Sequence, residues 1–321
     1  MRTPFKALTF LITGLALFAA GCFERSDLYG PLHDGVKMIY AVNPSAYYAY
    51  IATEDGYLKK LTVPSTGATG VGAYPVNGKP VILENVAGQL TFYVYENSSW
   101  STVSHSIGTL VSPVRYESTV YYTNGDAIYS FDGKAVQTLV SSVAMPASIL
   151  ALACYNDEIY VLGDDYKIYR FNGTDTCVST GTGSVTAGTT LLYFTIVDGV
   201  VYAGYDNTFN YGALGGAITT ISSLSNIQSY AVYDASHVFA AGFNGAQFEI
   251  MKCNGASFAT FKTIVDTAGT ISLAALSATK LAVGICGSTA HDGLYVLDTE
   301  TGEMTMLIAE SVTGVNVYNS I

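Results

Sequence analysis

The chain has 321 residues, with 14 Lys and Arg against 25 Asp and Glu, and a formal net charge of −11 at pH 7. Charged residues make up 12 % of it, about half of the roughly 25 % usual in soluble domains, whereas Gly (32) and Tyr (25) are abundant. These values exclude a disordered chain, which would be highly charged and poor in aromatic residues. They also exclude a basic nucleic-acid-binding protein and a coiled coil.

The first 22 residues have the pattern of an export signal. Arg2 and Lys6 form a short positive segment, and the apolar run 7–20 follows it. This run is too short to span a hydrocarbon core of ~30 Å, but it has the length of a signal-peptide core. Small residues at 19–21 then precede Cys22.

This segment resembles the lipobox signal of bacterial lipoproteins. The resemblance implies cleavage before Cys22 and lipidation of that cysteine, and more than one acyl chain gives stable membrane anchoring. The alternative is an ordinary secretory signal with Cys22 as a free thiol. We therefore expect a signal peptide over 1–21, a lipidated cysteine and short tether over 22–35, and a folded region over 36–321. Phe23 follows the cysteine where an Asp would resemble an inner-membrane retention signal, so we expect the outer membrane in a cell that has two.

The rest of the chain alternates apolar and polar residues with a period of two. Segments 119–133 and 158–173 align as a Val/Ile-Tyr strand, a Gly/Asp turn, an Ile-Tyr-x-Phe strand and Asp/Asn-Gly. Such alternation around Asn-Gly and Asp-Gly turns predicts β-hairpins. Weaker copies lie at 50–58, 201–209, 238–248 and 281–298.

The hairpins recur at a period near forty. Their anchor residues are Tyr50, Phe92, Tyr121, Tyr160, Tyr202, Phe239 and Leu281. The separations are 42, 29, 39, 42, 37 and 42 residues. Such a period with about four strands per unit is typical of a β-propeller. We predict an all-β fold with a single propeller of seven blades, or alternatively six, because the second unit is short.

An apolar strand precedes several hairpins, at 148–154, 191–197 and 270–276, and we expect it to be the innermost strand, covered on both faces. A fourth strand follows, as at 303–308. The terminal strand 314–320 can pair with 36–42 and close the ring, which removes free sheet edges.

The whole region after the tether resembles β-propeller repeat proteins. The stretch 294–303 is similar to hairpins of quinoprotein-like propellers, and the Ile-Tyr-x-Phe-Asp/Asn-Gly copies are similar to those of propeller lipoproteins. Some propeller lipoproteins serve outer-membrane assembly, so the resemblance implies a binding or scaffold role. The sequence lacks the motifs of zinc proteases, P-loops and EF-hands.

Residues with chemical potential are few. His291 and its neighbour Asp292 lie in a long turn and could act as a base, although a solvated turn is the simpler interpretation. Cys154, Cys177, Cys253 and Cys286 match no zinc or haem spacing, and we expect isolated thiols, with three disulfide connectivities left open. We predict no catalytic residue, no metal and no cofactor.

One end of the ring is the candidate binding surface. Turns between the second and third strands of successive blades should lie together there and present acidic and aromatic side chains. The expected binding residues are Glu54, Asp55, Trp100, Asp126, Asp164, Asp165, Tyr166, Tyr205, Asp206, His291 and Asp292. The alternative is that Asp is present because it suits tight turns.

The sequence thus predicts a membrane-anchored, extracytoplasmic, non-catalytic binding or scaffold module for envelope proteins. A carbohydrate or cell-wall binding module is the alternative, and a propeller lyase, hydrolase or oxidoreductase a further one. The membrane through Cys22 and an envelope protein or glycan are the expected partners, and nucleic acid is not.

Overall fold

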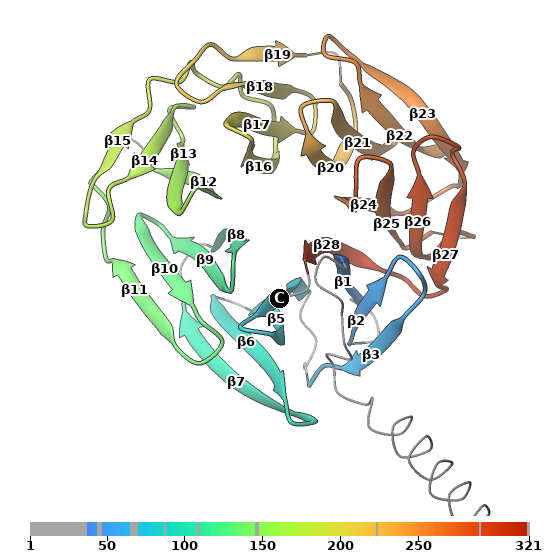
Figure 1. The fold of residues 1–321 in the computed structure, drawn as a ribbon, viewed down its shortest axis with the longest axis horizontal. Coiled ribbons are helices and arrows are strands. Elements are labelled where there is room, and N and C mark those ends of the chain that lie inside the picture. The colour runs from blue at the N-terminus through green and yellow to red at the C-terminus, as the bar shows by residue number, and fades with distance from the viewer. Residues whose placement is uncertain are drawn as a thin grey trace, which may run out of the picture. The chain divides into compact units, whose positions relative to one another are not determined.

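The computed structural model describes residues 37–43, 47–64, 70–86, 88–107, 110–144, 148–222, 224–288 and 290–319. The predicted signal peptide, Cys22 and the tether lie outside these residues. Residues 37–318 form one unit, in which seven four-stranded antiparallel sheets, the blades, are arranged in a ring (Figure 1). The described residues contain no helix able to cross a membrane. The fold is a seven-bladed β-propeller, as the repeat predicts.

The blades are numbered here in chain order, and the strands of each are given from the innermost outward. Blade 1 comprises β28 (Thr313–Asn319), β1 (Lys37–Asn43), β2 (Tyr48–Thr53) and β3 (Leu58–Thr62). Blade 2 comprises β4 (Gly70–Val76), β5 (Lys79–Val86), β6 (Gln89–Glu96) and β7 (Ser99–Ser106). Blade 3 comprises β8 (Leu110–Tyr116), β9 (Thr119–Asn124), β10 (Ala127–Phe131) and β11 (Val136–Val140). Blade 4 comprises β12 (Ile149–Tyr155), β13 (Glu158–Gly163), β14 (Ile168–Phe171) and β15 (Cys177–Ser179).

The remaining three blades complete the ring. Blade 5 comprises β16 (Leu191–Val197), β17 (Val200–Tyr205), β18 (Phe209–Ala213) and β19 (Thr219–Ile221). Blade 6 comprises β20 (Ile227–Asp234), β21 (His237–Phe243), β22 (Gln247–Cys253) and β23 (Phe258–Val265). Blade 7 comprises β24 (Thr270–Ala275), β25 (Lys280–Cys286), β26 (Gly293–Asp298) and β27 (Met304–Ile308).

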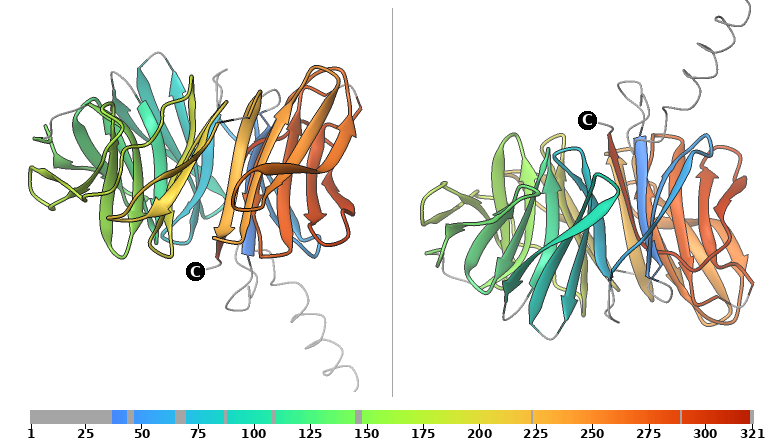
Figure 2. Two further views of the ribbon diagram at one scale, coloured as in Figure 1. Left: turned by 90° about the horizontal axis from the view of Figure 1, so that it is seen from above. Right: turned by 90° about the horizontal axis from the view of Figure 1, so that it is seen from below.

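The last strand of the chain closes the ring. β28 pairs with β1 and supplies the innermost strand of blade 1, as the sequence predicts. The side views in Figure 2 show the inner strands running roughly along the ring axis and the outer strands tilted away from it. Blade 1 therefore joins two segments from opposite ends of the chain, and every other blade is built from consecutive strands.

Closure explains the short second unit. Because β28 is innermost in blade 1, the anchor Tyr50 on β2 lies on a third strand, and so does Phe92 on β6. The five later anchors lie on second strands. In blade 2 the second-strand residue opposite Phe92 is Leu83. Blade 2 is complete, and segment 110–116 is the first strand of blade 3.

The core lies between blades and is centred on their second strands. β17, β21 and β25 are buried almost throughout, whereas β16, an innermost strand, is mostly half-buried. The expectation that innermost strands are covered on both faces is therefore wrong for β16, which borders the ring axis. Second strands have hydrogen-bonded neighbours on both edges and another blade on each face, so Phe239 and Leu281 are fully buried. Each such side chain contributes ~1.5–3 kcal/mol.

A glycine allows close approach of two blades. A Cβ atom at Gly204 on β17 would lie 2.5 Å from the ring of Tyr230 in the next blade. Tyr230 is 2 % exposed and stacks on Phe209 with 5.1 Å between ring centroids. The glycine in this second strand is therefore required by packing.

Candidate functional site

The structure brings together most of the predicted turn residues. The connections between second and third strands carry Asp126 in blade 3, residues 164–166 in blade 4, Asp206 in blade 5 and residues 291–292 in blade 7. Because adjacent strands are antiparallel, these connections lie at one end of the ring. We call it the turn end.

Glu54, Asp55 and Trp100 do not lie in such turns. Glu54 and Asp55 connect β2 to β3, the third and fourth strands of blade 1, and so lie at the opposite end. The prediction for Glu54 and Asp55 was wrong because β28 is the first strand of blade 1, so each strand encoded at 37–62 lies one position further out than expected. Trp100 lies on the outermost strand β7, where its indole N–H donates to the Thr62 carbonyl at 2.7 Å.

The acidic side chains of blades 4 and 5 accept hydrogen bonds from other parts of their own blades. The Asp164 carboxylate accepts the Ser148 N–H at 3.1 Å, and that of Asp206 accepts the N–H groups of Thr189 and Thr190 at 3.1 Å each. Asp165 accepts the Tyr169 hydroxyl at 2.6 Å. These contacts satisfy backbone N–H donors just before the innermost strands and the Tyr169 hydroxyl on β14, so they give these aspartates a structural role within their blades.

The aromatic residues proposed with them are separated. Tyr166 is 37 % exposed at the tip of its turn, whereas Tyr205 at the end of β17 is 3 % exposed. Trp100 lies in blade 2 at the outer rim. The three rings therefore form no single exposed platform.

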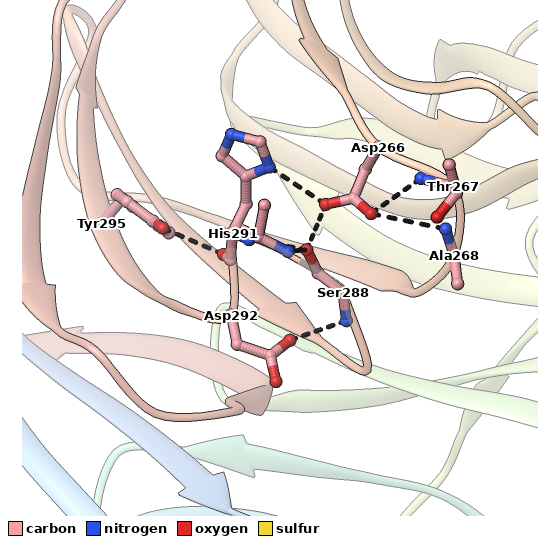
Figure 3. Close-up of polar contacts among 8 residues, drawn as sticks. Asp266, Thr267, Ala268, Ser288, His291, Asp292 and Tyr295 are labelled. Carbon is pink, nitrogen blue, oxygen red and sulfur yellow. Dashed lines mark hydrogen bonds and ion pairs between the residues drawn. The ribbon is translucent and has the colours of Figure 1, made fainter.

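His291 has a different acidic partner from the predicted one. Its Nδ1 lies 3.0 Å from Oδ2 of Asp266, which follows β23 in the connection from blade 6 to blade 7 (Figure 3). The Asp266 side chain is fully buried, and that of His291 is 38 % exposed. An ionised carboxylate is a hydrogen-bond acceptor and cannot donate, so Nδ1–H of His291 donates to Asp266. In the neutral tautomer with this Nδ1–H, Nε2 is the acceptor.

A network around Asp266 fixes the imidazole. The Asp266 carboxylate also accepts the Thr267 N–H at 2.7 Å and the Ser288 hydroxyl. The Tyr295 hydroxyl donates to the His291 carbonyl at 2.9 Å. Asp292, the predicted partner, instead accepts the Ser288 N–H at 2.7 Å and the Ser311 hydroxyl.

A groove adjoins His291 between blades 6 and 7. It has a volume of about 360 Å³, and its lining includes Lys262, Ile264, Val265, His291, Tyr295 and Met304. Figure 3 shows the second imidazole nitrogen directed away from Asp266. The groove thus offers an apolar floor, the second imidazole nitrogen of His291 and the Lys262 ammonium, which donates to the Gly302 carbonyl at 2.9 Å. The apolar floor can bind a side chain, and the imidazole nitrogen can accept a hydrogen bond or a proton from a ligand.

Asp266 and Ser288 were missed from the sequence. The signal that could have found Asp266 is its position between an outermost strand and the next innermost strand, which places it at the turn end. The sequence holds no local cue to its contact with His291, because the two residues are 25 positions apart in different connections.

In the described part of the chain, the cysteines form no disulfide and the residue types that can bind metal ions form no metal site. Cys154, Cys177, Cys253 and Cys286 are free thiols. Burial raises the pKa of Cys154 to about 12 and that of Cys177 to about 11. Within the described ranges no three His, Cys, Asp or Glu residues are placed to hold a metal ion together.

Comparison with known proteins shows the fold alone. No protein-family model and no curated protein sequence matches the chain. Virginiamycin B lyase from Staphylococcus aureus is similar in structure, with 9 % identity and a TM-score of 0.58, over 77 % of this chain and 88 % of the lyase. AztD from Citrobacter koseri is similar with 8 % identity and a TM-score of 0.57, over 89 % of this chain and 98 % of AztD. The computationally designed protein Ika8 is similar with 13 % identity and a TM-score of 0.53, over 85 % of this chain and 86 % of Ika8.

Proposed function

We propose that the protein is a lipid-anchored binding propeller of a bacterial cell envelope, and that the groove between blades 6 and 7 receives a protein partner. The observation that carries this proposal is the exposed apolar lining of that groove beside a fixed hydrogen-bond acceptor. Val265, which lines the groove, is 75 % exposed. Met306 on the neighbouring outer strand β27 lies outside this lining and is 50 % exposed, which adds apolar surface beside the groove. Apolar side chains beside a few placed polar groups are the usual make-up of a recognition surface.

The groove defines the chemistry of the partner. Ile264, Val265 and Met304 suit an apolar side chain, and Nε2 of His291 suits an N–H or O–H donor beside it. A peptide segment supplies both groups at once. The groove is rigid, because Ile264 is 8 % exposed and packs in the core shared by blades 6 and 7.

The experiment is crosslinking in intact cells that have lipidation machinery, followed by mass spectrometry of what the full chain captures. Val265→Asp places a charge on the groove without opening the core. Val178→Asp is the matched control, since Val178 is 51 % exposed on the outermost strand β15 of blade 4. Cys22→Ser tests the anchor. The aspartates of blades 4 and 5 are unsuitable for this purpose because they hold backbone N–H groups.

We expect one or two envelope proteins to be captured by the wild type and by Val178→Asp, and their yield to fall at least tenfold for Val265→Asp. Cys22→Ser should release the protein from the membrane fraction. Equal capture by the two valine variants would exclude the groove as the binding surface. Retention of the protein on peptidoglycan without any captured protein would contradict a protein partner and support the cell wall as the ligand.

The His291–Asp266 pair favours a second candidate, an enzyme that uses Nε2 of His291 as a base. In that case Asp266 is the positioning residue. Acylation of Nε2 by diethyl pyrocarbonate, followed by mass spectrometry, tests it in the wild type and in Asp266→Asn. His237, whose Nδ1 lies 2.8 Å from Asp234, is the internal control. Slower labelling of His291 alone would support a base activated by Asp266, and unchanged labelling would exclude it.

A further inference from the structure

A channel runs along the ring axis, bordered by the innermost strands. It consists of two cavities of about 390 Å³ and 400 Å³. The residues that line both are Tyr74, Pro113, Leu192, Tyr193 and Asn316. Because they share this lining, the cavities are sections of one space, and each has the volume of a small-molecule site, about 300–1,000 Å³.

Arg115 is the one charged side chain among the described residues that line the channel. It is half-buried on β8, where burial lowers the pKa of its guanidinium. No ion pair joins Arg115 to a carboxylate in the part of the chain that the structure describes. The nearby Glu117 carboxylate raises the pKa of Arg115, but by less than burial lowers it. A partly buried cation with no carboxylate in direct contact is costly to maintain.

Structural contacts use only part of this side chain. Its Nε–H donates to the Pro75 carbonyl at 2.9 Å, and its guanidinium carbon lies 4.8 Å from the ring centroid of Tyr318. Tyr318 in turn packs against Tyr40 and Tyr74, with centroid distances of 5.9 Å and 6.1 Å. A guanidinium has five N–H donors in a planar fork, so the bond to Pro75 and the stacked face leave the terminal nitrogens for a further acceptor.

We propose that this channel binds a small organic carboxylate, with its carboxylate on Arg115 and its apolar or aromatic body against Tyr74, Pro113, Leu192 and Tyr193. A guanidinium binds a carboxylate through two parallel N–H···O bonds. A phosphate monoester carries more charge than one arginine balances, and the rest of the lining is apolar or neutral. The site is separate from the groove between blades 6 and 7.

The test is a titration of the full chain in phospholipid nanodiscs, with empty nanodiscs as the blank. The probes are 3-phenylpropionate, its neutral amide and phenyl phosphate. Saturation-transfer NMR measures the binding of each probe. Arg115→Gln removes the charge. Arg170→Gln is the matched control, because the Arg170 side chain is 52 % exposed and lies 2.9 Å from Glu158 in blade 4.

The wild type and Arg170→Gln should bind the carboxylate at least tenfold more tightly than the amide, and Arg115→Gln should lose this preference. Equal binding of carboxylate and amide by the wild type, or a preference kept by Arg115→Gln, would overturn the proposal. Tighter binding of phenyl phosphate than of the carboxylate would overturn the ligand class.

A second variant covers the case in which Arg115→Gln does not fold. Leu192→Trp narrows the channel and retains Arg115, and Leu192 is only half-buried on β16. Loss of carboxylate binding by Leu192→Trp supports the channel as the site, and unchanged binding contradicts it. None of these readouts involves Val265, so failure of the protein-partner proposal would be seen separately.

Discussion

Blades 1 and 4 contain the same three-part contact, built in different ways. In blade 4 the Tyr160 hydroxyl donates to Glu158 at 2.7 Å and Arg170 donates to the same carboxylate at 2.9 Å. In blade 1 the Tyr50 hydroxyl donates to Glu310 at 2.6 Å, and the Lys60 ammonium does so at 2.6 Å. In both blades the tyrosine and the cation are directly opposite each other on paired strands.

The two contacts differ in the origin of the glutamate. Glu158 lies two residues from Tyr160 on the same strand, so its contact adds to what sheet pairing already fixes. Glu310 lies 260 residues from Tyr50, in the segment that leads from β27 into β28. In blade 4 this contact therefore stabilises a single blade. In blade 1 the same contact joins the N-terminal and C-terminal parts of the propeller. We call the region where residues 309–319, which include β28, meet β1, β2 and β3 the seam.

The largest expected effect comes from a charge buried at the seam. Val315 on β28 is 5 % exposed and packs with Ile39 and Ala41 of β1. Val315→Asp should lower the free energy of unfolding by about 3–5 kcal/mol, the cost of an unpaired buried charge. Hydrogen exchange followed by mass spectrometry should show amides of β28 and β1 losing protection while those of blade 4 keep it.

The matched change in blade 4 is Ala151→Asp on β12, where Ala151 is 3 % exposed. Its cost in stability should be similar, but its loss of protection should centre on blades 4 and 5, whose core contains Ala151. A uniform rise in exchange throughout the ring for both variants would show that the seam does not open independently.

A smaller effect is expected from the glutamates themselves. Glu310→Gln keeps an oxygen for Tyr50 but loses the charge that binds Lys60, and it should lower the free energy of unfolding by roughly 0.5–1 kcal/mol, as for exposed ion pairs. Glu158→Gln should cost less than about 0.5 kcal/mol, because Glu158 is on the same strand as Tyr160 and its contact joins no separate segments of the chain. Urea denaturation measures both, and an equal or larger loss for Glu158→Gln would remove the distinction between the two blades.

The fold was largely predictable because its signals are local. Hairpins at 119–133 and 158–173, apolar strands before them and a final strand able to pair with 36–42 all follow from alternation and turn residues. The wrong prediction for Glu54 and Asp55 has a topological cause. The C-terminal strand β28 is the innermost strand of blade 1, so every other strand of that blade lies one position further out than its order in the sequence suggests. No local pattern at residues 48–62 contains that information.

The candidate sites were much less predictable. His291 was identified from its turn, but its partner Asp266 belongs to another connection, and their contact depends on how blades 6 and 7 pack. Arg115 was not identified, because a single cation on a strand shows no pattern until the ring places it among tyrosines from blades 1 and 2. Sites built from several blades depend on the rotation between blades, which local periodicity does not specify.

The smallest expected effect is the pH dependence of the seam contact. Hydrogen bonds from Lys60 and Tyr50 hold the pKa of Glu310 below its ordinary value of 4.5. Because the pKa is depressed in the folded state, the contribution of Glu310 to stability is present above about pH 4.5 and is lost as the pH falls through the folded-state pKa. Gln at this position does not titrate. The melting temperatures of the wild type and Glu310→Gln should therefore differ at pH 7 and converge toward pH 3. A difference in melting temperature that persists at pH 3 would mean that Glu310 stabilises the seam by packing. Its charge would then have no part in joining the N-terminal and C-terminal parts of the propeller.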